Sequence, residues 1–138
     1  MGLPAAAEAR LYYRAARQRY EDALLLLEAG RTTGAVYMAG YTVECYLKAL
    51  ILSAVAARVR AEILGKFRGN RAHDIEWLSV LYRQTTQVNV PREVAKHLSR
   101  TATWTTDLRY SSSAPKRRDA DAFVESVTAI MAWADGRM

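Results

Sequence analysis

The sequence predicts an all-α protein, an up-and-down bundle of four to five helices that forms a single domain over residues 1–138. Three observations favour this class. Apolar side chains recur at spacings of three and four residues along most of the chain, and no segment has the apolar–polar alternation of a strand. Glycine (7) and proline (3) are too scarce for the many turns of an all-β domain. The hydrophobic share of 51% and the charged share of 25% are those of an ordinary globular domain.

The first predicted helix covers residues 5–29 and has one apolar face. This face consists of Leu11, Tyr12, Ala16, Tyr20, Leu24 and Leu27. Gly30 is expected to end the helix, because glycine readily adopts the left-handed conformation found after many helices. Thr32 or Thr33 is expected to cap the next helix with its hydroxyl group.

The second predicted helix, residues 33–60, is apolar on nearly all sides, which is typical of a helix surrounded by others. Its apolar stretch is long enough to span a bilayer, but Glu44 and Lys48 lie near the middle. Because each charge costs about 2.5–3.5 kcal/mol in a membrane, we expect the core helix of a soluble protein instead. The N-terminal residues do not resemble a secretory signal, so we expect a cytoplasmic protein without membrane association.

Between Arg58 and Asp74, five basic residues accompany one acid, Glu62, which predicts the frayed end of the second helix followed by a basic loop. Beyond it we expect helices at residues 75–84, 91–103 and 119–134, and an irregular segment at residues 105–116. Asp74 caps the first of these helices and Pro91 begins the second. Their predicted buried residues are Ile75, Leu78, Leu81, Tyr82, Val94, Leu98, Phe123, Val127, Ile130 and Ala134.

The composition limits the chemistry of the protein. Twenty Lys and Arg residues against 14 acids give a net charge of +6, which favours an anionic partner such as nucleic acid, a nucleotide or an acidic protein. The single cysteine excludes an intramolecular disulfide and a cysteine-based zinc site. The two histidines are far apart and lack a metal-binding spacing, so neither a metal nor a cofactor is predicted.

A polar line runs along the second helix at Tyr37, Tyr41, Glu44 and Lys48, with spacings of 4, 3 and 4 residues. Glu44 precedes Lys48 by one helical turn, the favourable order for an ion pair. One interpretation is therefore a structural polar core. The alternative is a ligand-facing stripe in a pocket between helices, because charges on a buried helix need partners.

Two further groups of residues leave alternatives open. His73 and Asp74 lie where the basic loop meets a helix, so the histidine either packs at the turn or acts as an acid or base on a phosphodiester. Arg109 and Tyr110 either bind phosphate and stack on a base, or dock their own loop by pairing Arg109 with Glu44.

An arginine followed five residues later by a histidine occurs twice, as Arg68 with His73 and as Arg92 with His97. Arginine is so frequent in this chain that the spacing also arises by chance. Either match alone is therefore weak evidence of a site.

Three segments together resemble the HEPN domain family, the higher eukaryote and prokaryote nucleotide-binding domains. They read AVYMAGYTVECYLKAL at residues 35–50, HDIEWL at 73–78 and LRY at 108–110. The resemblance implies a helical bundle that commonly forms a homodimer. It also implies a frequent association with a minimal nucleotidyltransferase in prokaryotic toxin–antitoxin or defence modules.

One branch of that family consists of metal-independent ribonucleases with an arginine and a histidine on a late helix. Here Arg92 and His97 fit the spacing, but Ser99 stands where that branch often has an aromatic residue. Residues 91–110 are more similar to the branch without a clear ribonuclease motif.

The resemblance and the charge together predict a protein that acts by binding nucleotide or RNA, and they leave open whether it is also an enzyme. The expected ligand-binding residues are Arg68, Arg71, His73, Arg109 and Tyr110, and the expected structural polar core is Tyr41, Glu44, Lys48 and Asp74. The first alternative is a metal-independent endoribonuclease toxin that uses Arg92 and His97. The second is a protein-interaction module without catalysis.

Overall fold

The structure is a computed structural model that describes residues 3–111 and 113–138. This part of the chain contains six α-helices, two 3-10 helices and no strand, so the all-α class is confirmed and the expected four to five helices are too few. The α-helices are α1 (Ala7–Glu28), α2 (Thr32–Ala54), α3 (Ala57–Lys66), α4 (Ile75–Thr86), α5 (Arg92–Thr101) and α6 (Arg117–Asp135). The 3-10 helices are η1 (Asn70–His73) and η2 (Thr106–Tyr110).

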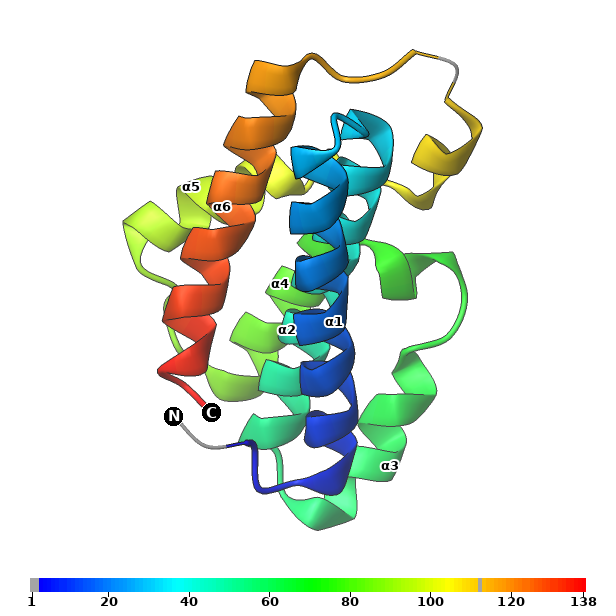
Figure 1. The fold of residues 1–138 in the computed structure, drawn as a ribbon. Helices are drawn as coiled ribbons and strands as arrows, with labels where there is room; N and C mark the ends of the chain where they lie inside the picture. The colour runs from blue at the N-terminus through cyan, green and yellow to red at the C-terminus, as the bar shows by residue number, and fades with distance from the viewer. Residues whose placement is uncertain (1–2, 112) are drawn as a thin grey trace.

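Helices α1 and α2 form a hairpin that turns at Gly30 (Figure 1). Gly30 has a φ of +76°, its N–H donates to the carbonyl of Leu27 at 3.0 Å, and the N–H of Arg31 donates to that of Leu26 at 2.8 Å. These are the two bonds of a Schellman motif, so the predicted stop at Gly30 is confirmed. The predicted threonine cap is wrong, because Arg31 is the N-cap residue and the Thr32 hydroxyl donates to the Pro115 carbonyl at 2.8 Å.

The buried face of α1 agrees in part with the predicted one: Ala16 is buried, and Tyr12, Tyr20 and Leu27 are half-buried against the core. Ala9, Ala16 and Ala23 are fully buried, whereas Leu11 is 69% exposed and Leu24 is 41% exposed. The three alanines recur every seven residues and so share one side of the helix. Because alanine is small, this side packs close to α2, and Leu11 and Leu24 are turned outward.

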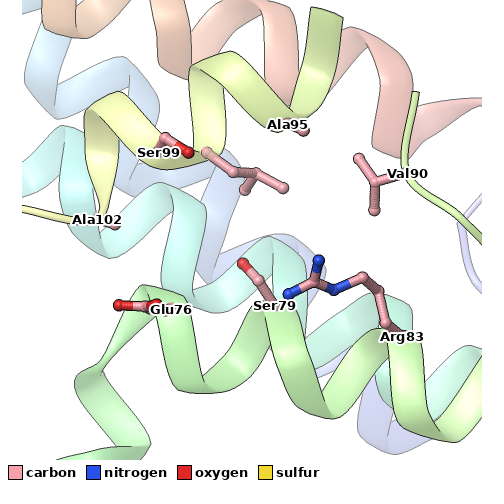
Figure 2. A pocket seen from close by; sticks show the side chains of 8 residues that line it. Glu76, Ser79, Arg83, Val90, Ala95, Ser99 and Ala102 are labelled. Atoms are coloured by element: carbon pink, nitrogen blue, oxygen red, sulfur yellow. The ribbon is translucent and has the colours of Figure 1, made fainter. Parts of the chain in front are cut away.

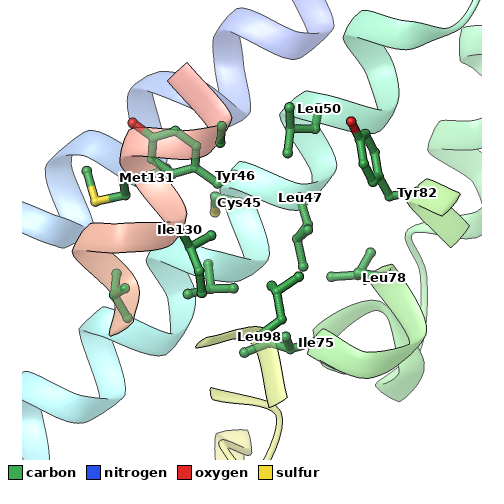
Figure 3. Packing of buried hydrophobic residues seen from close by; sticks show 14 of the residues in the cluster. Cys45, Tyr46, Leu47, Leu50, Ile75, Leu78, Tyr82, Leu98, Ile130 and Met131 are labelled. Carbon is green, nitrogen blue, oxygen red and sulfur yellow. The ribbon is translucent and has the colours of Figure 1, made fainter. Parts of the chain in front are cut away.

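Helix α2 is the core of the bundle. It packs against α1, α4 and α6, and its side chains from Thr42 to Leu52 are all buried. Figure 3 shows Leu47 and Leu50 of this helix among side chains from α4, α5 and α6. Length and composition would allow α2 to cross a membrane, but 83% of its most apolar window is buried inside the bundle. Its hydropathy is therefore explained by its position in the core.

The second helix does not continue to residue 60 as expected. It ends at Ala54, and the extended backbone of Val55 and Ala56 leads into α3. Helix α3 folds back so that Ile63 is buried and the Phe67 ring, just after the helix, packs edge-to-face on Tyr12 at 5.9 Å. The predicted frayed end is thus a separate amphipathic helix, with Arg58 and Lys66 exposed and Arg60 half-buried.

The later helices lie near their predicted positions. Helix α4 extends two residues further than expected, α5 begins after Pro91 and ends two residues early, and α6 begins two residues early. Most of their predicted core residues are buried, but Val94 and Phe123 are half-buried. The segment expected to be irregular contains η2.

Candidate functional site

Glu44 is the centre of a polar cluster inside the bundle. Glu44 and Lys48 are each 4% exposed, and Oε2 of Glu44 accepts a hydrogen bond from Lys48 Nζ at 2.9 Å. The other oxygen, Oε1, lies 2.9 Å from Nδ1 of His73, which is 29 residues further along the chain. Both carboxylate oxygens therefore have a partner, as a buried charge requires.

The ammonium group of Lys48 lies between aromatic rings. Nζ is 5.5 Å from the ring centroid of Tyr12 and 5.3 Å from that of Phe67. These distances are within the range of a cation–π interaction. The rings and the carboxylate of Glu44 thus surround the charge, and the pair resembles a structural polar core more than a ligand-facing stripe.

The turn before α4 carries His73 to the edge of this cluster. Gly69 has a φ of +79°, so the chain can enter the tight 3-10 turn η1 there. One residue after η1, a carboxylate oxygen of Asp74 accepts a hydrogen bond from the Trp77 N–H at 3.2 Å and caps α4. The His73 side chain remains 43% exposed, so the ring joins the buried carboxylate to the surface.

Aromatic side chains extend the cluster toward η2. The Tyr41 ring lies 6.3 Å from that of His73 and 5.0 Å from that of Trp104, and its hydroxyl lies 3.2 Å from that of Tyr37. Trp104 is buried against Gly40, where a Cβ atom would lie 2.1 Å from the indole ring. Gly40 is therefore required for this close approach.

The basic residues beside His73 face solvent. Arg68 and Arg71 are exposed, and neither forms an ion pair within the described chain. The Arg71 guanidinium lies 5.1 Å from the ring centroid of Trp77, which restricts its position. We call Arg68, Arg71 and His73 the basic turn.

Arg68, Arg71 and His73 lie in one short segment between α3 and α4, whereas Arg109 and Tyr110 belong to η2. Tyr110 is 75% exposed at the end of η2. The side chain of Arg109 lies outside the part that the structure describes, and so does its expected pairing with Glu44. The partners of Glu44 that the structure does describe are Lys48 and His73.

The residues of the ribonuclease alternative lie elsewhere, on α5. Arg92 is exposed in the first turn of that helix. His97 is half-buried, and its Nδ1 lies 2.9 Å from the hydroxyl oxygen of Ser126, a fully buried residue of α6. This hydrogen bond joins α5 to α6 and fixes the orientation of the imidazole ring.

The site offers neither a nucleophilic thiol nor a metal centre in the residues described. Burial, together with the nearby negative charge of Glu44, raises the pKa of Cys45 to about 12. The thiol therefore stays protonated at neutral pH, when it is a poor nucleophile. Among residues 3–111 and 113–138, no group of three histidine, cysteine or acidic side chains could hold a metal ion.

A pocket of about 290 Å³ lies between α4 and α5, apart from the basic turn (Figure 2). Glu76, Ser79 and Arg83 line it from α4, and small side chains such as Ala95 and Ser99 face them from α5. None of the predicted site residues lines this pocket.

The fold and the cluster define a class: a small helical bundle with a buried Glu–Lys pair, a histidine held at the surface and a basic turn. Comparison with protein families agrees with the helical fold, because the family model of the HEPN domain matches residues 9–137. The chain belongs to the HEPN domain family, and the predicted resemblance is confirmed. No curated protein and no solved structure matches the chain.

Sequence reasoning missed two relationships in this site. The bond between Glu44 and His73 joins helix α2 to a turn 29 residues away, and no local spacing signals it. The packing of Trp104 against Gly40 has only one signal in the sequence, a glycine inside a long apolar helix. Such a glycine indicates that another residue approaches closely, but not which one.

Proposed function

We propose that the protein binds RNA or nucleotides at the basic turn, with Tyr110 of η2 as an additional stacking side chain. The observation that carries this proposal is the hydrogen bond between Glu44 and His73, because it anchors the turn to the most buried helix of the bundle. A surface fixed in this way loses little conformational entropy when a ligand binds.

The chemistry of these side chains suits a nucleic acid. Arginine offers two parallel N–H donors to a phosphate group, and Arg68 and Arg71 are exposed without an acidic partner in the described chain. Histidine, tyrosine and the guanidinium plane of arginine stack on unpaired bases. The expected ligand is therefore single-stranded RNA or a free nucleotide, with several phosphates preferred over one.

Membership of the HEPN family supports a wider proposal about context. The protein acts in the cytoplasm of a prokaryote as part of a toxin–antitoxin or defence module, with a minimal nucleotidyltransferase as partner and as a homodimer. Mixing the purified chain with the nucleotidyltransferase encoded beside its gene tests the partnership. A complex on size-exclusion chromatography supports it, and separate elution of the two proteins contradicts it.

The binding proposal is tested by titrating fluorescein-labelled single-stranded RNA with the intact protein and following fluorescence anisotropy. The double variant Arg68→Gln/Arg71→Gln is expected to bind at least tenfold more weakly than the parent at 0.1 M salt. Parallel titrations with ATP and AMP separate RNA binding from binding of a free nucleotide. Absence of binding to every one of these ligands at 0.1 mM protein would overturn the proposal.

The second candidate is a metal-independent endoribonuclease that uses Arg92 and His97. The observation in its favour is the hydrogen bond between His97 and Ser126, since it fixes the imidazole ring while Arg92 is exposed on the same helix. The same bond also serves as a structural link between α5 and α6, which is the interpretation we prefer.

A further inference from the structure

The outward face of α1 carries a stripe of five residues, which we call the α1 stripe: Leu11, Arg14, Gln18, Glu21 and Leu25. Their spacings of 3, 4, 3 and 4 place them within an arc of roughly 80°, at 100° per residue. The same geometry puts the stripe on the side opposite the buried alanines, so it points away from the rest of the bundle. Figure 1 shows that no other element covers α1 on the side that faces the viewer.

The stripe exposes two large apolar side chains. Leu11 is 69% exposed and Leu25 is 67% exposed, and among the described residues only Tyr110 is a more exposed large hydrophobic side chain. Single exposed leucines are common on protein surfaces. Two of them at the ends of one straight stripe, with three polar residues between them, form a pattern that suits a second helix.

The charges of the stripe have no partner inside the described chain, unlike those beside it. Arg17 pairs with Asp135, and Arg19 pairs with Asp22. In contrast, Arg14 and Glu21 are exposed and form no ion pair or hydrogen bond in the residues described. They cannot pair with each other either, because seven residues of helix separate them by roughly 10 Å.

The order of the stripe is self-complementary. Read forward it is leucine, cation, amide, anion, leucine, and read backward it presents leucine opposite leucine and anion opposite cation. An antiparallel second copy, with a two-fold axis at Gln18, therefore sets Leu11 against Leu25 and Arg14 beside Glu21, twice. A parallel copy would set Arg14 against Arg14 and Glu21 against Glu21, which is repulsive.

We propose that the α1 stripe is the homodimer interface, occupied by an antiparallel copy of the same helix. A two-fold pairing of this kind uses the same patch on both subunits. This inference supplies the surface for the homodimer proposed above and does not depend on RNA binding. The stripe includes neither Arg92 nor His97, so this dimer is held together by residues outside the ribonuclease alternative.

Charge reversal tests the pairing directly, with sedimentation velocity as the measurement of the dimer dissociation constant. Arg14→Glu alone places two acids together at each contact, and Glu21→Arg alone places two arginines together. Each single variant is expected to weaken the dimer at least tenfold. The double variant Arg14→Glu/Glu21→Arg recreates the pairs in reverse and is expected to return to within threefold of the parent.

Disulfide cross-linking determines the register of the two α1 helices in the dimer. In an antiparallel dimer the two Gln18 residues face each other, so Gln18→Cys is expected to form a covalent dimer on oxidation. Leu11→Cys is the matched control, because its two copies would lie roughly 21 Å apart along the helices. Cys45 is buried and does not compete.

Three outcomes would overturn the proposal. They are a monomeric parent at 0.1 mM protein, a failure of the double charge reversal to restore a dimer that the single reversals weaken, and cross-linking of Leu11→Cys as efficient as that of Gln18→Cys. Circular dichroism establishes that each variant is folded. The RNA titration measures binding at the basic turn, whereas sedimentation velocity measures association of two chains. The two proposals can therefore fail independently.

Discussion

The Nδ1 atom of His73 lies 2.9 Å from Oε1 of Glu44, so a half-exposed histidine is attached to a fully enclosed carboxylate. Glu44 also accepts a hydrogen bond from Lys48 at 2.9 Å on the same helix. One buried acid thereby stabilises the core helix and fixes the turn that carries the basic residues. The polar core and the basic turn meet at this residue.

Removing the charge of Glu44 is expected to be costly. Glu44→Gln leaves the buried ammonium of Lys48 without its counter-charge, and breaking a buried pair in this way costs about 3–5 kcal/mol. Urea unfolding measures the free energy of unfolding. Glu62→Gln, an exposed site on α3, is the control and should change it by less than about 0.5 kcal/mol. Equal stabilities for the two variants would contradict the role of Glu44.

Gly40 is expected to tolerate no side chain. Gly40→Ala places a Cβ atom 2.1 Å from the Trp104 ring, so the indole must move out of its buried position. We expect a loss of about 1–3 kcal/mol from overpacking and a red shift in tryptophan fluorescence. Gly65→Ala is the matched control: its Cβ would meet nothing within 4 Å, and alanine should stabilise α3 by about 1 kcal/mol. A Gly40→Ala variant as stable as the parent would show that Trp104 does not pack there.

Cys45 is expected to resist modification while the protein is folded. Burial raises the pKa of its thiol to about 12, whereas an unfolded thiol has a pKa of about 8.5. The raised pKa contributes stability below about pH 8.5, and this contribution is lost as the pH rises toward 12. At pH 8.5 a thiol reagent such as DTNB should react fully in urea and very slowly in its absence. Rapid reaction of the folded protein would contradict the burial of Cys45.

Substitution of His97 distinguishes a protein that only binds RNA from a ribonuclease. We expect the parent to leave RNA intact in EDTA, and His97→Ala to lose about 1 kcal/mol of stability because Ser126 is left without its partner. Gel analysis of labelled RNA and urea unfolding measure the two effects. Cleavage in EDTA that disappears in a folded His97→Ala variant would instead establish the ribonuclease.

Local patterns predicted most of the fold. The positions of α4 and α6, the stop at Gly30 and the core residues of α2 follow from periodicity and from turn chemistry, which act over a few residues. The break at Val55 was missed because neither glycine nor proline marks it, and packing of Ile63 and Phe67 directs α3 instead. The predicted burial of Leu11 and Leu24 on α1 was wrong, because the packing of small alanine side chains against α2 was underestimated relative to that of leucine.

The sequence predicted several residues of the candidate site, but not how these residues contact one another. The spacing of Glu44 and Lys48 indicated their pairing, and Asp74 was recognised as a cap before a helix. Their connection to His73 could not be predicted, because it depends on how η1 folds back onto α2. Tertiary contacts of this kind leave no periodic pattern of residues in the sequence.

The most direct test of the central claim compares two arginines in similar settings. Arg71 lies 5.1 Å from the ring of Trp77 in the basic turn, and Arg137 lies 5.7 Å from the ring of Trp133 at the end of α6. Anisotropy titrations with single-stranded RNA at several salt concentrations measure affinity and its salt dependence. If the basic turn binds RNA, Arg71→Gln weakens binding about three- to tenfold and lowers the salt slope by about 0.7, while Arg137→Gln changes neither. Equal effects of the two substitutions, or no effect of Arg71→Gln on an RNA-binding parent, would contradict the proposed function.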